Sequence, residues 1–161
     1  MSAEIKNYVL NLLESYQDRE RKIAVLRYEL DHPMQISQDE MIRTMNFTRG
    51  DGTGRTDGHI SNKTLYIALN YKEQADRINA ETVDEVARRL VILEQEQNRL
   101  VYYVSLLDKR QADVLRLAFF ERSSWDEIAK MLGVALRTAH KIKTQALDKL
   151  VEMYTFSGVT K

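Results

Sequence analysis

Six side chains between residues 137 and 144 carry groups that could bind a nucleic acid. They are Arg137, Thr138, His140, Lys141, Lys143 and Thr144. Apolar residues recur at helical spacing in the same stretch, as Ala139, Ile142, Ala146, Leu150 and Met153, so a helix would separate a buried stripe from a polar, basic face. An arginine in the first turn can make two hydrogen bonds to guanine, whereas lysines suit phosphate oxygens. The pattern predicts that Arg137 reads a base, that Lys141 and Lys143 contact phosphates, and that Thr144 and His140 add polar contacts.

Two shorter helices are expected to position this face. The first covers about residues 109–120, with Val114, Leu115, Ala118 and Phe119 on one side. The second begins at a capping box of Ser124 and Glu127 and ends at Gly133, because glycine takes the left-handed conformation at little cost. Its expected buried side is Ile128, Ala129, Met131 and Leu132. The basic helix follows over about residues 136–154. A glycine turn before a basic helix is typical of a DNA-binding helix-turn-helix. The alternative is a plain three-helix packing unit with a solvated basic face.

The same stretch resembles region 4 of the sigma-70 family factors. The likeness rests on residues 110–117, 124–129 and 132–134, on Ile142, and on the ending ALDKL at residues 146–150. LuxR-type response-regulator domains are similar but match less well. Two residues depart from the region 4 pattern: Ala135 replaces a capping serine or threonine, and Leu136 replaces a polar or basic contact residue. This resemblance implies a C-terminal DNA-binding domain over residues 106–161.

The wider chain resembles sigma-like phage transcription activators of the RinA/ArpU group. That likeness rests on the glycine-containing segment followed by Ser61-Asn62-Lys63-Thr64, and on residues 120–125. It implies binding to double-stranded promoter DNA and contact with bacterial RNA polymerase. Because no counterpart of sigma region 2 is recognisable, the protein is not expected to start transcription alone. A small terminase-like DNA-packaging protein is the alternative function, although its helix-turn-helix would more often precede the oligomerising helices. A purely structural helical scaffold is a third possibility.

Composition indicates an all-α globular protein, since 43% of the residues are hydrophobic, 30% are charged and only one is proline. The net charge is zero, but residues 1–105 carry 14 basic and 17 acidic side chains while residues 106–161 carry 10 and 7. Positive charge therefore concentrates beside the candidate DNA face. The absence of cysteine excludes disulfides and thiolate metal sites. No apolar run is long enough to span a membrane and no signal peptide is recognisable, so a cytoplasmic protein is expected. The resemblance to sigma-like activators implies a bacterial, nucleoid-associated one.

Residues 1–105 are expected to form a helical N-terminal region with two coiled-coil-like seams. The first lies in a single helix over residues 2–30, as Ile5, Val9, Leu12, Tyr16, Ile23, Leu26 and Leu30, with Arg19 as its polar member. The second lies in a helix that should begin at a capping box of Thr82 and Glu85, as Val83, Val86, Leu90, Leu93, Leu100, Val104 and Leu107, with Gln97 as its polar member. We expect the seams to pair within one chain. The alternative is a homodimer through helix 83–107.

The segment between the seams should contain two further helices and a glycine-rich loop. A capping box at residues 37–40 would open a short helix with Met41, Ile42 and Met45 apolar, and residues 61–79 would form another with Leu65, Ala68, Leu69 and Ile78 inward. The loop at residues 49–58 lacks the spacing of a phosphate-binding loop, so a linker is favoured. The three histidines have no carboxylate or histidine partner at zinc-ligand spacing. The protein is thus expected to be no enzyme, with no catalytic residues, no metal site and no cofactor.

Overall fold

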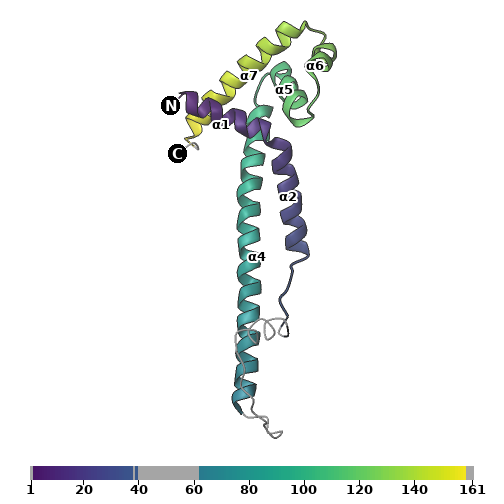
Figure 1. Ribbon diagram of the computed structural model, residues 1–161. Coiled ribbons are helices and arrows are strands. Elements are labelled where there is room, and N and C mark those ends of the chain that lie inside the picture. Colours follow the sequence, from purple (N-terminus) through teal and green to yellow (C-terminus); the bar gives the residue numbers. More distant parts are fainter. Residues whose placement is uncertain (1, 38, 40–61, 159–161) are drawn as a thin grey trace. The chain divides into compact units, whose positions relative to one another are not determined.

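The computed structural model describes residues 2–37, 39 and 62–158, and within these ranges the chain is helical with short turns and no strand (Figure 1). The α-helices are α1 (Ser2–Glu14), α2 (Tyr16–Asp31), α4 (Asn62–Ser105), α5 (Lys109–Leu115), α6 (Trp125–Leu132) and α7 (Leu136–Ser157). A π-helical segment, η1 (Arg116–Phe120), joins α5 to the turn before α6. The predicted all-α class is therefore confirmed. The chain forms two compact units, one reaching to Val25 and resuming at Val91, the other covering Leu26–Leu90.

The first unit has a core that joins both ends of the chain. Its buried residues are Val9, Leu12 and Leu13 of α1, Leu100 and Val104 of α4, Leu107, Ala112 and Leu115 before and within α5, and Ala146, Leu147, Leu150 and Tyr154 of α7. Burial of these side chains removes a large apolar area from water, which is the main force that holds helices together. This core therefore fixes the C-terminal half of α7, while the candidate DNA face lies on its N-terminal half.

The single helix predicted for residues 2–30 is wrong, because the chain turns at Ser15 between α1 and α2. The Ser15 hydroxyl donates to the Asn11 carbonyl oxygen at 2.5 Å, a bond of a kind that often bends helices. The Arg19 side chain in turn donates to the Leu12 carbonyl oxygen at 2.6 Å, which gives a backbone acceptor at the break a partner. The predicted burial of the first seam is confirmed for Val9, Leu12, Arg19 and Ile23, which are all buried.

The helix start predicted at Thr82 is also wrong, because α4 continues through this position for 44 residues. The Thr82 hydroxyl donates to the Ile78 carbonyl oxygen at 2.9 Å, as it does inside a helix. Glu85 pairs with Arg89 at 2.8 Å, one turn further along, and so acts as an ordinary i to i+4 partner. A capping box competes with helix continuation, and here the uninterrupted backbone hydrogen bonds of α4 prevail.

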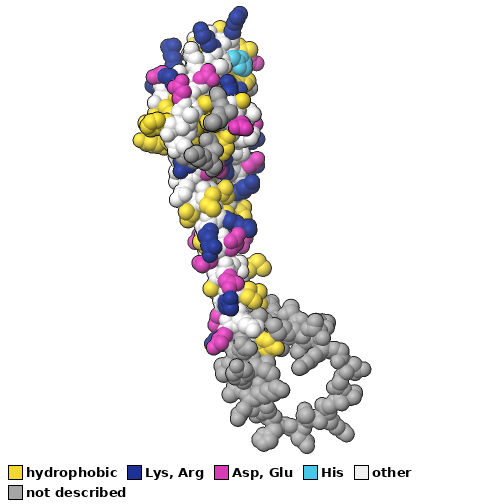
Figure 2. Space-filling view, turned by 90° about the vertical axis from the view of Figure 1, so that its left-hand side faces the viewer, with side chains coloured by type: hydrophobic (Ala, Val, Ile, Leu, Met, Phe, Trp, Pro, Cys, Tyr) yellow, Lys and Arg dark blue, Asp and Glu magenta, His cyan; other side chains and the backbone are white. Residues whose placement is uncertain are grey.

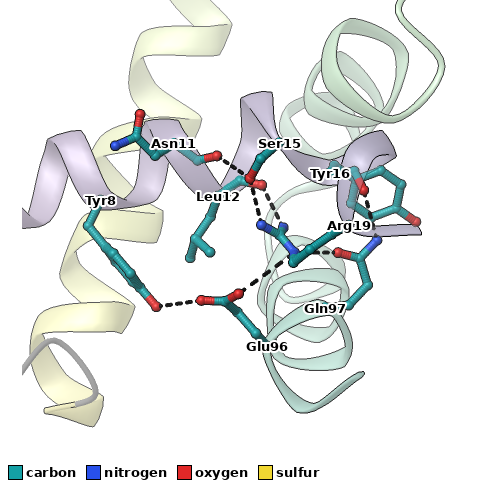
Figure 3. A network of polar contacts seen from close by, with 8 residues as sticks. All are labelled: Tyr8, Asn11, Leu12, Ser15, Tyr16, Arg19, Glu96 and Gln97. Carbon is teal, nitrogen blue, oxygen red and sulfur yellow. Dashed lines mark hydrogen bonds and ion pairs between the residues drawn. The ribbon is translucent and has the colours of Figure 1, made fainter. Parts of the chain in front are cut away.

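The polar members of the two seams meet inside the first unit (Figure 3). Arg19 Nε donates to Gln97 Oε1 at 2.8 Å, and both side chains are buried. Figure 3 also shows Glu96 between them and Tyr8: it accepts from the Tyr8 hydroxyl at 3.1 Å and lies 3.9 Å from Arg19 Nε. The expected pairing of the seams within one chain is thus confirmed for this unit.

The second unit is described only in part. Ala75 and Leu90 are buried there, and the Asn79 side chain bonds both the N–H and the carbonyl oxygen of Ile36. Ile78, expected to face inward, is 37% exposed, which corrects that expectation. The expectations for the capping box at residues 37–40, for the apolar residues 41–45, for the loop at residues 49–58 and for the inward side chains of residues 65–69 lie outside the described residues and side chains.

Candidate nucleic-acid interface

The turn that positions the basic helix follows the predicted local signals closely. Ser124 caps α6 through a complete capping box with Glu127: the Glu127 N–H donates to the Ser124 hydroxyl at 3.4 Å and the Ser124 N–H donates to Glu127 at 2.9 Å. Gly133 ends α6 with φ 62° and ψ 36°, the left-handed conformation that other residues adopt at a cost. Ala135 is the N-cap of α7 and supplies no side-chain hydrogen bond, as its residue type implied. The helix-turn-helix geometry is therefore built by local sequence.

A small core locks the two helices of the motif together. Val114, Leu117, Ile128 and Ala139 are buried, with Ala118, Trp125, Leu132, Val134 and Ile142 packed partly buried around them. The fully buried Ala139 of α7 lets the backbone of this helix come near α6. One expected core residue is wrong: Met131 is 67% exposed, because it falls on the outer side of α6. The core fixes which face of α7 is left for a ligand.

The segment that enters the motif is not a regular α-helix. Residues 109–120 are helical as predicted, but the last five form the π-helical η1, whose Arg116 carbonyl oxygen accepts from Glu121 N–H at 2.9 Å. Arg122 then takes a positive φ of 56°, and the Ser123 N–H donates a hydrogen bond to the Leu117 carbonyl oxygen at 2.8 Å. This wider turn lets Phe120 stack on Tyr16, with ring centroids 3.8 Å apart, while the preceding Phe119 faces α7. The π segment thus connects the motif to the first core.

Three of the six predicted contact residues extend from α7 without a partner among the described residues. Arg137, Thr138 and Lys141 are exposed, and each makes no hydrogen bond, ion pair or ring contact within that part of the chain. They occupy the first two turns of α7, the part of a recognition helix that enters the major groove. Figure 2 shows Lys and Arg side chains projecting at the top of the view, where α6 and the start of α7 lie. These cations are available to an external anion.

The other three predicted contact residues make local contacts. The ring centroids of His140 and Trp125 lie 4.3 Å apart, and the Thr144 hydroxyl donates to the His140 carbonyl oxygen at 3.1 Å. Lys143 is half-buried, with its ammonium 5.2 Å from the Trp125 ring and 5.4 Å from the Phe119 ring. An ammonium at this distance is attracted by the negative ring face. A phosphate contact by Lys143 would compete with these rings, so Lys143 differs in setting from Lys141.

The structure adds two basic residues that sequence reasoning missed. Lys109 and Arg110 begin α5 and line a shallow groove together with Thr138, Lys141 and Gln145 of α7. Asp108 also borders the groove, but it pairs with Lys149 at 2.7 Å. Three cations therefore flank one groove, an arrangement that attracts a phosphate backbone. The signal in the sequence was a basic pair in the first turn of a predicted helix, beyond the expected recognition helix.

No three histidine or acidic side chains of the described residues come close enough to bind a metal ion. None of the helices described is both long and apolar enough to cross a bilayer.

Comparison with known proteins bears on the C-terminal part of the chain alone. The family model described as Sigma-70, region 4 matches residues 104–152. Searches of curated proteins and of solved structures found no match. The matched residues include all of α5, η1 and α6 and most of α7, so the sequence family and the observed geometry agree. Residues 104–152 of this chain are therefore a sigma-70 region 4-like helix-turn-helix domain.

Proposed function

We propose that the protein is a sequence-specific DNA-binding transcription regulator. The observation that carries this proposal is the exposure of Arg137 and Lys141, without partners in the described chain, on the first two turns of α7 in a sigma region 4-like motif. The guanidinium of an arginine such as Arg137 can donate two hydrogen bonds to a guanine edge. Lys141 shares its groove with Lys109 and Arg110 and serves phosphate contacts.

We further propose that the regulator is a phage or prophage activator that acts with host RNA polymerase. The support is the resemblance of the whole chain to the RinA/ArpU group, together with the region 4 match at the C-terminal end. The second candidate is a DNA-packaging protein of the small terminase kind. The observation that supports it is the 44-residue helix α4, because a long helix is a common oligomerising element. A footprint upstream of a phage operon supports the activator, and a footprint at a packaging site supports the alternative.

The primary test is quantitative gel-shift binding to a duplex selected from a random library. Arg137→Ala should weaken binding to the selected duplex by about 1–3 kcal/mol and leave binding to scrambled DNA nearly unchanged. Lys141→Ala should weaken binding to both and lower the slope of log affinity against log salt by about one.

The matched control is Lys72→Ala, which removes an exposed lysine of the second unit. It should leave both affinities and the salt slope at their wild-type values. Selection that enriches no sequence, or wild-type affinity for both α7 variants at every salt concentration, would refute the proposed sequence-specific DNA binding and the activator role with it.

A further inference from the structure

The first residue of α7 is an exposed apolar side chain at the tip of the motif. Leu136 is 43% exposed, although the motif has a core in which Ala139 is completely buried and Ile142 partly so. Exposure of a leucine leaves apolar area in water, at a cost that burial against a partner would recover. Part of the Leu136 side chain is therefore available to an external partner.

Leu136 lies on an open part of the surface. It borders a shallow hollow with Asp126, Ala129 and Lys130 of α6 and with Gly133 and Val134 of the turn. Ala135, its neighbour and the N-cap, carries no polar side chain that would hydrate this tip. Around the helix axis, Leu136 lies about 100° from Arg137, so the two side chains can face adjacent base pairs.

We propose that Leu136 reads a thymine through the 5-methyl group of that base. The inference rests on the proposed DNA-binding function, because it places the N-terminus of α7 in the major groove. Among the unmodified bases, only thymine presents an apolar group there. A leucine side chain cannot hydrogen-bond, so against the other base edges it would cover donors or acceptors without replacing their bonds to water. Leucine at this position consequently selects thymine beside the base that Arg137 contacts.

The experiment removes only the proposed contact group. In the selected duplex, each thymine is replaced in turn by deoxyuridine, which lacks the 5-methyl group and keeps every hydrogen-bonding atom. The wild-type protein should lose roughly fourfold in affinity at one thymine, the value expected for one buried methyl group. Leu136→Ala should bind the thymine duplex more weakly and show no further loss at that position. Met131→Ala, which removes an exposed apolar side chain of α6, should keep the wild-type pattern.

Two outcomes overturn the inference without touching the proposed function. One is specific binding by the wild type that is insensitive to deoxyuridine at every thymine. The other is a deoxyuridine loss in Leu136→Ala equal to that of the wild type. Equal wild-type binding to selected and scrambled duplexes would instead refute the proposed function itself.

A second variant separates loss of the proposed contact from any folding defect of Leu136→Ala. Leu136→Gln keeps a side chain of similar length and can make two hydrogen bonds to adenine. Repeated selection with this variant should change the preferred base at the same single position from thymine, with the rest of the site retained. Retention of thymine at that position would contradict the assignment.

Discussion

Replacing Arg19 by methionine should lower the free energy of unfolding by about 3–5 kcal/mol. The Arg19 side chain is 6% exposed, and its guanidinium donates to Gln97 at 2.8 Å, to the Ser15 hydroxyl at 2.7 Å and to the Leu12 carbonyl oxygen at 2.6 Å (Figure 3). Methionine fills similar space but donates no hydrogen bond. A buried acceptor without a donor costs about 1–3 kcal/mol, and both Gln97 and the Leu12 carbonyl lose theirs.

The assay is urea denaturation followed by circular dichroism at the helical band, on the full chain. A double-mutant cycle with Gln97→Leu isolates the contact between the two seams. The double variant should be less destabilised than the sum of the single variants by about 1.5–3 kcal/mol, because the orphaned amide oxygen is then removed as well.

Arg21→Met is the matched control, since Arg21 is exposed and its only partner among the described residues is exposed Asp18, at 3.4 Å. Its effect should stay within about 0.5 kcal/mol of the wild type. Two results would refute the reasoning on Arg19: a loss below about 1 kcal/mol for Arg19→Met, or strictly additive losses in the cycle. Either would mean that the buried network contributes no net coupling between α2 and α4.

Four further predictions concern the stability of the first unit. Ile128→Ala should lower the free energy of unfolding by about 2–5 kcal/mol because Ile128 is completely buried. Ile142→Ala should lower it less because Ile142 is partly exposed, and equal melting temperatures for both variants would contradict this packing. Ser124→Ala should cost about 1 kcal/mol through loss of the cap. The Ser124 backbone N–H and hydroxyl hold the pKa of the Glu127 carboxyl below its usual value. Glu127 therefore stabilises the fold at any pH above its usual pKa, and this stabilisation is lost as the pH falls through the lowered pKa of the folded state. Denaturation of Glu127→Gln across the same pH range should lack this part of the pH dependence. Tyr154→Phe should leave stability unchanged or raise it by up to about 1 kcal/mol, because the buried hydroxyl has no hydrogen-bond partner among the described residues, and a clear loss in denaturation would reveal a partner there.

Homodimerisation and the domain boundary at residue 105 stay predictions. The inner half of the second seam, from Gln97 to Leu107, is buried by other parts of the same chain. A homodimer through helix 83–107 would therefore have to use its outer half or another face of α4. Sedimentation of the wild type and of Leu93→Glu addresses this directly.

The sequence by itself determined the helix-turn-helix, because the signals that define this motif are local. Ser124 and Glu127 satisfy each other's backbone within one turn, and Gly133 takes a conformation that depends on its own missing side chain. The periodicity of apolar residues likewise indicated the buried faces of α1, α2 and α4, since it follows from helix geometry alone. Both polar seam members, Arg19 and Gln97, were identified as breaks in these patterns.

Only the tertiary structure decided which local signals take effect and how distant residues meet. Thr82 and Glu85 form a capping pattern in sequence, yet α4 passes through them because the continuous helix satisfies the backbone equally well. Ser15 carries no strong stop signal, but the Arg19 side chain stabilises a break there only once α2 packs beside α4. The meeting of Arg19 with Gln97, 78 residues away, depends on helix packing. The grouping of Lys109 and Arg110 with Lys141 likewise depends on how α5 crosses α7, and no pattern confined to a single helix contains that information.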